Sequence, residues 1–483
     1  MKKVRIVATM GPAVESEQKI IQLYNAGVNI IRFNFSHANY ENARKVANNI
    51  KKLNSLGKTK LSLLLDTKGP EIRTGDMDGI YNYKKGEVFK IFVDKTKMKE
   101  KSDLFCDYEY LVEDMKVGKS IIIDSGVFIV KVIGKTKDFL EVKALNAASI
   151  KSRRHINLPG TKLKLPGLIE QDKKDILFAI ENDFDFIAAS FIRSKENVVE
   201  IKELLKANKG EFIRVLSKIE TQEGIDNMDG IIEESDGVMI ARGDLGIEVP
   251  IEKLAKYQKE QVLKCRAQGK IVITATHFLE TMITNPFPTR AESSDITNAV
   301  LQKPDTLMLS GETSIGQFPI ETAKMMAKII KEAEKAIDYK YEDFSYKNLS
   351  EKDKEKKILI KSGLHLCDQL KIKAMLVFTK SGLLARLTSS FKPKIPVYAF
   401  TKEEKVVRYM NILFGIDAIS LKDWNQENYE HNLASSIKYL LKNKLVKKED
   451  KVVIITDLRE EGFEIPVLEI IHIKDFCTKI NCL

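Results

Sequence analysis

The chain has few of the residues that cross-link a protein or anchor it in a membrane. Its five cysteines are scattered and form no CxxC pair, which argues against a disulfide framework: Cys106, Cys265, Cys367, Cys477 and Cys482. No apolar run approaches the roughly 20 residues that a membrane-spanning helix needs. The apolar stretch that follows the basic start is too short for a signal peptide. We therefore expect a cytoplasmic protein without a membrane partner.

The basic residues of this 483-residue chain are dispersed rather than clustered. Lys and Arg number 79 and Asp and Glu number 68, so the formal net charge is +11. Most lysines alternate with acids, as in 351–357, whereas a nucleic-acid footprint needs clustered basic residues. We expect no nucleic-acid partner. Hydrophobic residues at 43% and charged residues at 30% are typical of a globular chain, and this length favours about three domains.

Several common catalytic motifs are also missing. The sequence contains no GxSxG, HExxH or GxxxxGK[ST] motif, and its six histidines lack the spacing of zinc ligands. These absences argue against the corresponding hydrolases, zinc enzymes and P-loop nucleotide-binding proteins.

Short, β-rich apolar segments recur along the chain and alternate with amphipathic helices. The predicted strands are 4–10, 29–35, 61–67, 184–191, 212–220, 237–245, 270–276 and 305–312. The clearest predicted helices are 17–25, 40–56, 195–208 and 254–268. Continuously apolar strands separated by helices indicate a parallel sheet, and eight such units favour a closed (β/α)8 TIM barrel of the α/β class.

Two segments depart from this alternation. Residues 71–155 show short alternating runs separated by Gly and Asp turns, which predicts a small all-β domain, a β-barrel lid, inserted after the third strand. The alternation resumes after a charged linker, so residues 345–483 are predicted to form a C-terminal α/β domain. The barrel is then made of 1–70 and 156–340.

Polar residues collect where the predicted barrel strands end, which is where such barrels carry their function. Glu220 and Asp244 are predicted at neighbouring strand ends, and their oxygen ligands suit Mg²⁺ or Mn²⁺. Lys218 shares a strand face with Glu220. Lys218 is then either a functional residue of this site or a structural one, buried in an ion pair with Glu220.

Arginines accompany this group. Arg32 ends the second predicted strand, and Arg73 follows the third. A divalent metal, a lysine and arginines together stabilise a phosphoryl group during transfer. Gly243 allows an anion to approach the backbone beside Asp244.

These segments, in this order, resemble the pyruvate kinase family over nearly the whole chain. The matching stretches are RFNFSH (32–37), LDTKGPEIRTG (65–75), SKIE (217–220), MIARGDLGIEVP (239–250), NPFPTRAESSD (285–295) and LMLSGETSIG (307–316). The resemblance implies the same domain plan and a Mg²⁺- and K⁺-dependent enzyme that transfers the phosphoryl group of phosphoenolpyruvate to ADP, giving pyruvate and ATP. It also implies a homotetramer.

The resemblance assigns roles residue by residue. The catalytic residues are Lys218, Thr276 and Arg32, and the Mg²⁺ ligands are Glu220 and Asp244. Phosphoenolpyruvate is expected to contact Arg32, Lys218, Gly243, Asp244 and Thr276. The K⁺ site is expected at Asn34, Ser36, Asp66 and Thr67, with Glu71 as the residue that accompanies K⁺ dependence. Nucleotide contacts are expected from Arg73, Arg154 and Asn34.

The chain departs from the family pattern at several positions. His277 follows Thr276 where the family has Gln, and we expect it to pack behind the site rather than to perturb proton transfer. Arg154 and His155 replace Lys and Gly at the return from the inserted domain. Arginine keeps the charge, and His155 is expected to stiffen that hinge.

The C-terminal domain departs most. Leu384 stands where the family's effector loop, which begins at Thr379, has Ser or Thr, and an acidic segment, 458–464, replaces a late Gly/Ser-rich effector loop. We therefore expect weak or absent activation by fructose 1,6-bisphosphate.

Two other functions remain open for the protein as a whole: a metal-dependent lyase or aldolase acting on pyruvate-like enolates, and a non-catalytic binding protein on an enzyme scaffold. Retention of Lys218, Glu220 and Asp244 argues against the latter.

Overall fold

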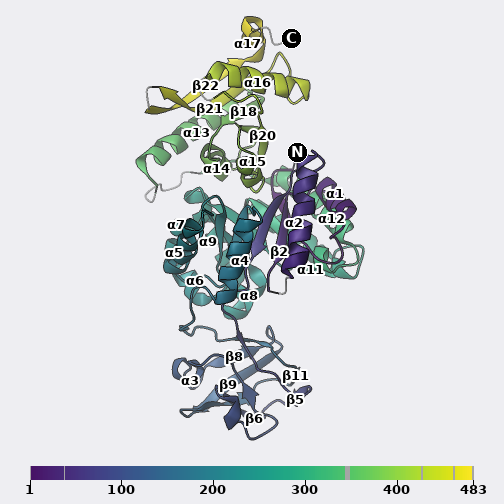
Figure 1. Ribbon diagram of the computed structural model, residues 1–483, viewed down its shortest axis with the longest axis vertical. Coiled ribbons are helices and arrows are strands. Elements are labelled where there is room, and N and C mark those ends of the chain that lie inside the picture. The colour runs from purple at the N-terminus through teal and green to yellow at the C-terminus, as the bar shows by residue number, and fades with distance from the viewer. Residues whose placement is uncertain (1, 37–38, 343–348, 426–427, 461–462, 481–483) are drawn as a thin grey trace.

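The computed structural model describes residues 2–36, 39–342, 349–425, 428–460 and 463–480. Three bodies follow one another along the long axis, with the barrel between the inserted domain and the C-terminal domain (Figure 1). Within the described residues, no helix is both long and apolar enough to cross a membrane. Because the two outer bodies lie at opposite ends of the barrel, each end of the barrel strands faces a different domain.

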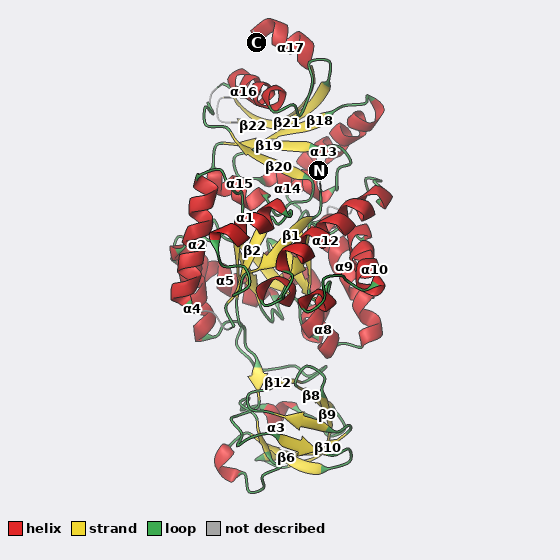
Figure 2. Cartoon of the chain, turned by 90° about the vertical axis from the view of Figure 1, so that its right-hand side faces the viewer, coloured by secondary structure: helices red, strands yellow, loops and turns green. Residues whose placement is uncertain are grey.

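The central body is a closed barrel of eight parallel strands, which confirms the predicted fold class. The strands are β1 (Arg5–Thr9), β2 (Ile30–Asn34), β3 (Ser62–Asp66), β13 (Phe186–Ala189), β14 (Arg214–Lys218), β15 (Gly237–Ala241), β16 (Ile271–Ala275) and β17 (Thr306–Leu309). Nearly all their residues are buried because helices cover the outside (Figure 2) and side chains fill the inside.

Some of the helices around the barrel begin with side-chain caps. Before α1 (Glu17–Asn25), the Ser16 side chain accepts a hydrogen bond from the Lys19 N–H. Before α2 (Tyr40–Ser55), the Asn39 side chain accepts hydrogen bonds from two backbone N–H groups of the first turn. The other covering helices are α4 (Glu170–Glu181), α5 (Lys195–Ala207), α7 (Met228–Glu234), α9 (Leu254–Ala267), α10 (Arg290–Leu301) and α12 (Pro319–Ala333).

Two of the predicted strands extend into segments that are helical in the structure. The strand predicted over 237–245 ends at Ala241, and α8 (Arg242–Glu248) begins at once. Charged Arg242 and Asp244 cannot continue a strand that is buried on both faces, and Leu245 is buried from the helix instead. Likewise the strand predicted over 305–312 stops at Leu309 before α11 (Gly311–Ser314).

The inserted domain is built mainly of strands, as predicted, with one short helix, α3 (Leu111–Asp114). Its larger sheet has the order β4-β12-β8-β9-β10-β6-β7, and β11 pairs with β5. These strands are β4 (Ile72–Arg73), β5 (Tyr81–Tyr83), β6 (Val88–Phe92), β7 (Leu104–Phe105), β8 (Ser120–Ile123), β9 (Phe128–Lys135), β10 (Phe139–Ala144), β11 (Ala148–Ile150) and β12 (His155–Asn157). Strands β4 and β12 pair antiparallel and form the hinge to the barrel. The exact domain boundaries remain a prediction.

The C-terminal domain has a five-stranded sheet in the order β20-β19-β18-β21-β22. Its strands are β18 (Ala374–Phe378), β19 (Val397–Thr401), β20 (Ile416–Ser420), β21 (Lys451–Glu460) and β22 (Phe463–His472). Its helices are α13 (Glu351–Gln369), α14 (Leu383–Ser390), α15 (Glu404–Met410), α16 (Tyr429–Lys442) and α17 (Ile473–Ile480). The acidic segment 458–464, which stands in place of the family's effector loop, forms in its described part the ends of the two arms of an antiparallel hairpin. Residues 461–462 lie outside the described residues.

Buried ion pairs attach the C-terminal domain to the amino-terminal ends of the barrel strands. Lys392 Nζ lies 2.5 Å from Asp305 Oδ1, directly before β17. Arg408 Nε lies 2.8 Å from Asp185 Oδ1, directly before β13. The carboxyl ends of the strands are therefore left to face the hinge of the inserted domain.

Candidate active site

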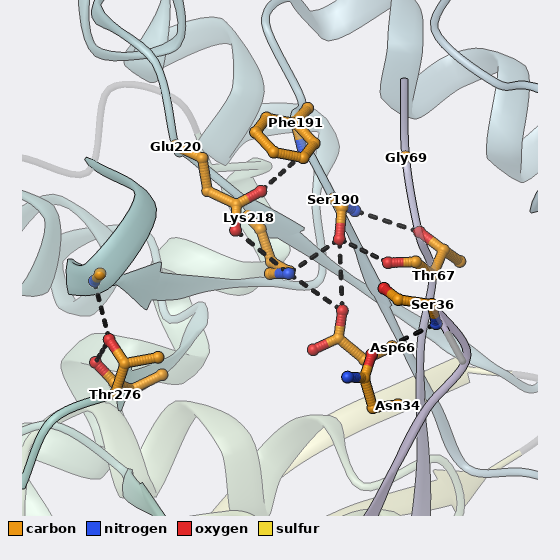
Figure 3. A network of polar contacts seen from close by, with 12 residues as sticks. Asn34, Ser36, Asp66, Thr67, Gly69, Ser190, Phe191, Lys218, Glu220 and Thr276 are labelled. Carbon is orange, nitrogen blue, oxygen red and sulfur yellow. Dashed lines mark hydrogen bonds and ion pairs between the residues drawn. The ribbon is translucent and has the colours of Figure 1, made fainter. Parts of the chain in front are cut away.

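The predicted site residues collect at the carboxyl ends of the barrel strands (Figure 3). The structure brings together Asn34 from β2, Asp66 from β3 and Lys218 from β14, with Glu220 just beyond β14. On β2 the side chains alternate between the two faces, and Phe33 and Phe35 are buried on the face opposite Arg32 and Asn34. The structure therefore brings these predicted residues together at one end of the barrel, as the strand-end rule leads one to expect.

Lys218 is at the centre of a buried polar network. Its Nζ lies 3.0 Å from Asp66 Oδ1, 3.1 Å from Glu220 Oε1 and 2.8 Å from Ser190 Oγ. Both carboxylate side chains are only 1% exposed. Lys218 therefore forms the ion pair with Glu220 that the sequence offered as an alternative. It also forms an ion pair with Asp66, so it bridges two carboxylates.

Charge pairing fixes the ionisation of this network. Burial alone would lower the pKa of Lys218, but the carboxylates of Asp66 and Glu220 raise it above its ordinary value. Burial raises the pKa of Asp66, and the charges of Arg32 and Lys218 outweigh that effect and lower it. Lys218 is consequently a permanent cation in the folded protein, available to an anion that enters the site.

Glu220 and Asp244 provide oxygen atoms suited to a divalent cation. Glu220 Oε2 accepts a hydrogen bond from the Phe191 N–H at 2.8 Å, and Asp244 lies in the first turn of α8, half-buried. Burial raises the pKa of Glu220, Lys218 lowers it, and the negative charge of Asp244 raises it again. A buried carboxylate held next to a second one would be stabilised by a divalent cation, so the residues fit such an ion.

The protein groups would supply only part of a metal's coordination shell. Among the described residues, no set of three or more His, Cys, Asp or Glu side chains is placed to hold one ion. Mg²⁺ commonly binds through one or two carboxylates and completes its shell with water and substrate oxygens. Two carboxylates without further protein ligands match that pattern.

The four residues expected at the K⁺ site lie at the ends of β2 and β3. The Ser36 N–H donates to Asn34 Oδ1 at 3.3 Å, and the Thr67 carbonyl accepts a hydrogen bond from Ser190 Oγ at 2.6 Å. Asp66 is engaged by Arg32, whose Nε lies 2.6 Å from Oδ2. The hydroxyl, carbonyl and amide oxygens around Asp66 are hard ligands of the kind that an alkali cation takes.

Thr276 lies in a strained turn after β16. Its φ is +70° and that of His277 is +57°, both in the left-handed region that β-branched and bulky residues rarely adopt. Thr276 Oγ1 accepts a hydrogen bond from the Gly243 N–H at 2.8 Å. The structure thus joins the two groups expected to contact the substrate carboxylate. The expectation that His277 packs behind the site is wrong, because its side chain is exposed.

Arg242 holds the strained turn, and sequence reasoning missed it. Its Nη2 donates to the Thr276 carbonyl at 2.6 Å, while its Nη1 pairs with Asp295 at 2.9 Å. Arg242 was interpreted as part of a strand rather than the start of α8, which concealed this role. Ser190 was also missed, although it directly follows β13 and the strand-end rule applies to it.

The expected nucleotide-binding arginines lie at the hinge. Arg73 Nη2 pairs with Glu71 Oε2 at 2.5 Å, and Arg73 Nη1 donates to the Arg153 carbonyl at 2.9 Å. Arg154 Nη1 lies 3.5 Å from Asp124 Oδ1, and its buried Nε has no hydrogen-bond partner within the described residues. Both guanidinium groups belong to the hinge between the lid and the barrel, near the carboxyl ends of the strands.

Glu248 makes a second contact between barrel and hinge, and it predicts a pH effect. Its Oε1 accepts a hydrogen bond from Asn157 Nδ2 at 2.8 Å. Burial raises the pKa of Glu248 to about 7 from 4.5, Asn157 opposes this, and Asp244 adds to it. Between those two values the folded protein holds a proton that the unfolded chain has lost, so stability falls as pH rises through that window.

Glu248→Gln should remove this penalty while keeping the hydrogen bond. We expect the free energy of unfolding of metal-free protein to rise by about 1–2 kcal/mol at pH 8 and to change little at pH 5. Urea unfolding at the two pH values measures the difference. An equal change at both would show that Glu248 does not titrate between them.

The barrel, the cationic group at its strand ends and the domain inserted beside them define an enzyme of the phosphotransferase class. Comparison with known proteins identifies the family within this class. The family described as "Pyruvate kinase, barrel domain" matches residues 1–323, and "Pyruvate kinase, alpha/beta domain" matches residues 358–463. The chain belongs to the pyruvate kinase family.

Individual relatives agree over most of both chains. A pyruvate kinase of Bacillus licheniformis is 38% identical, covering 99% of this chain and 82% of the relative. A pyruvate kinase of Staphylococcus epidermidis is 42% identical, covering 87% of this chain and 72% of the relative. The crystal structure of a pyruvate kinase from Cryptosporidium parvum superposes with a TM-score of 0.91 at 32% identity, covering 98% of this chain and 96% of the other.

Proposed function

We propose that this site performs the family's reaction, transfer of the phosphoryl group of phosphoenolpyruvate to ADP, with roles carried by the residues described above. The observation that carries the proposal is Lys218, a buried cation held between Asp66 and Glu220 at the strand ends. Arg32 adds a second cation beside it. Two fixed cations stabilise the negative charge that develops on the phosphoryl oxygens and on the enolate.

The substrate's carboxylate is assigned to Thr276 and to the backbone of Gly243 and Asp244. The Gly243 N–H and Thr276 Oγ1 already face each other, and a bound carboxylate would take over such hydrogen bonds. After transfer, Thr276 Oγ1 would relay a proton toward the enolate carbon. Glu220 and Asp244 would hold Mg²⁺ or Mn²⁺, which when bound supplies positive charge to the substrate oxygens.

ADP is assigned to the hinge side of the site. Arg73 and Arg154 would bind its phosphates, with Asn34 beside them, and Arg73 would exchange part of its pairing with Glu71 for the nucleotide. K⁺ would bind among Asn34, Ser36, Asp66 and Thr67. Glu71 stands at the position whose glutamate goes with K⁺ dependence in the family. The inserted domain would act as a lid that excludes water during transfer.

The two alternative functions fit the site less well. A lyase or aldolase needs no nucleotide clamp, and a binding protein needs no buried lysine bridging two carboxylates. By analogy with the family we also propose a homotetramer in the cytoplasm, with no nucleic-acid or membrane partner.

A turnover assay tests the function and its cation requirement together. Purified protein is mixed with phosphoenolpyruvate, ADP and Mg²⁺, with either K⁺ or tetramethylammonium, and pyruvate is followed. We expect pyruvate to form rapidly with K⁺ and much more slowly without it. Equal rates in both salts would remove the K⁺ assignment while leaving the transferase function.

The C-terminal domain carries a cavity that bears on regulation. It has a volume of about 870 Å³ and is lined by residues that include Thr379, Lys380 and Trp424. Leu384 is 2% exposed, so it packs in the core and offers no hydroxyl there. Within the cavity wall, Lys356 Nζ is neutralised by Asp457 Oδ2 at 2.7 Å. These features oppose binding of a doubly phosphorylated sugar.

We therefore predict that fructose 1,6-bisphosphate changes the half-saturating phosphoenolpyruvate concentration by less than tenfold. The measurement is a substrate titration with and without millimolar effector. A larger shift would show that other groups of the cavity bind the phosphates.

A further inference from the structure

Phe191 lies between Glu220 and the hinge of the lid. Its backbone N–H donates to Glu220 Oε2 at 2.8 Å (Figure 3). Its φ of +55° is in the left-handed region, which a bulky residue adopts only when its surroundings hold it there. The direction of that N–H, and with it the orientation of the Glu220 carboxylate, therefore depends on what packs against the Phe191 ring.

Both connections of the lid contact this ring. On the outgoing connection, a Cβ added to Gly69 would lie only 2.9 Å from Phe191 Cδ2, so the backbone passes close to the ring. On the returning connection, the His155 ring meets Phe191 edge to face, with ring centroids 5.8 Å apart and planes at 64°. Edge-to-face pairs in this range of distances are attractive.

His155 is itself fixed to the hinge. It is the first residue of β12 and pairs with Arg73 of β4, so the backbone that carries its ring belongs to this two-stranded connection. Strand β12 lies at the end of the inserted domain that faces the barrel (Figure 2). Burial lowers the pKa of His155, although Glu71 and Asp244 act to raise it. The ring is neutral at pH 7, and its contribution is packing rather than charge.

We propose that His155 is a positioning residue that couples the lid to the metal-binding carboxylate, because its ring holds Phe191 and the Phe191 N–H holds Glu220. The proposal rests on the assignment of Glu220 as a metal ligand. Coupling of this kind is reciprocal: a hinge position that favours the ring contact favours metal binding, and bound metal favours that hinge position.

The test measures Mn²⁺ binding to the free protein by electron paramagnetic resonance, without substrates or turnover. His155→Ala removes the ring, and His155→Phe keeps an aromatic edge without the imidazole nitrogens. We expect the Mn²⁺ dissociation constant to rise about 2- to 10-fold in the alanine variant, the factor that corresponds to one aromatic pair. The phenylalanine variant should stay within about twofold of the wild type, and the half-activating Mg²⁺ concentration should follow the same order.

Four results would overturn the proposal. If the alanine variant binds Mn²⁺ as tightly as the wild type, even with a lowered melting temperature, His155 has only a structural role. Equal weakening in the alanine and phenylalanine variants would show that the imidazole, not the ring contact, matters. Failure of the wild type to bind Mn²⁺, or unaltered binding in Glu220→Gln, would overturn the metal assignment itself and with it the coupling.

Discussion

Replacing Lys218 by methionine should lower kcat by about 10²–10³-fold or more. The side chain's Nζ is the one buried cation that contacts both Asp66 and Glu220 within the described residues, and methionine keeps its length while removing the charge. Loss of a single group that stabilises transition-state charge commonly costs at least that factor. Steady-state kinetics with phosphoenolpyruvate and ADP measures the effect, and circular dichroism verifies the fold.

The same substitution also breaks a buried ion pair, so a control must separate folding from catalysis. Lys392 provides it, since its side chain is 1% exposed and pairs with Asp305 at the opposite end of the barrel. Each methionine variant should lose about 3–5 kcal/mol of stability. Only Lys218→Met should lose turnover. If both variants lost kcat equally, the kinetic loss would reflect destabilisation, and a near-normal rate in Lys218→Met would remove Lys218 from the mechanism.

Glu220→Gln should weaken Mn²⁺ binding and lower turnover by at least about 100-fold. The amide keeps the size of the side chain and still accepts the Phe191 N–H hydrogen bond, but it removes the negative charge that a divalent cation needs. Titration of Mn²⁺ against the free protein measures affinity, and kinetics at saturating Mg²⁺ measures the remaining rate.

Glu334→Gln is the matched control for that experiment. Glu334 is also a buried glutamate, and its Oε1 accepts hydrogen bonds from the Lys3 and Val4 N–H groups, both at 2.7 Å, at the other end of the barrel. Its glutamine variant should bind Mn²⁺ and turn over as the wild type does. Tight Mn²⁺ binding by Glu220→Gln would show that the cation binds elsewhere.

The parts of the fold with strong periodicity could be predicted from the sequence alone. The helix at Glu17–Asn25 has the predicted bounds, and the strand predicted over 270–276 is one residue shorter at each end, because in both the apolar pattern and the polar neighbours change at nearly the same residues. The alternation of Arg32 and Asn34 with Phe33 likewise fixed the face of β2 that points to the site. These signals are local in the chain.

What the sequence could not reveal depends on residues that meet only after folding. The strained conformation of Thr276 is held by Arg242, which precedes it by 34 residues and which α8 turns toward it. Asp66 was expected only as a K⁺ ligand, yet it also pairs with Arg32 and Lys218. The acids of 458–464 are visible in the sequence, but the pairing of β21 with β22 along ten positions, which makes this segment part of a hairpin, is not.

The central claim is direct transfer of a phosphoryl group from phosphoenolpyruvate to ADP. Phosphorus NMR of a single mixture of protein, phosphoenolpyruvate, ADP, Mg²⁺ and K⁺ tests it most directly. The account predicts that the phosphoenolpyruvate resonance is replaced by the γ-phosphate resonance of ATP in equal amount, with pyruvate formed in step. Release of inorganic phosphate without ATP, or an unchanged phosphoenolpyruvate resonance, would contradict it.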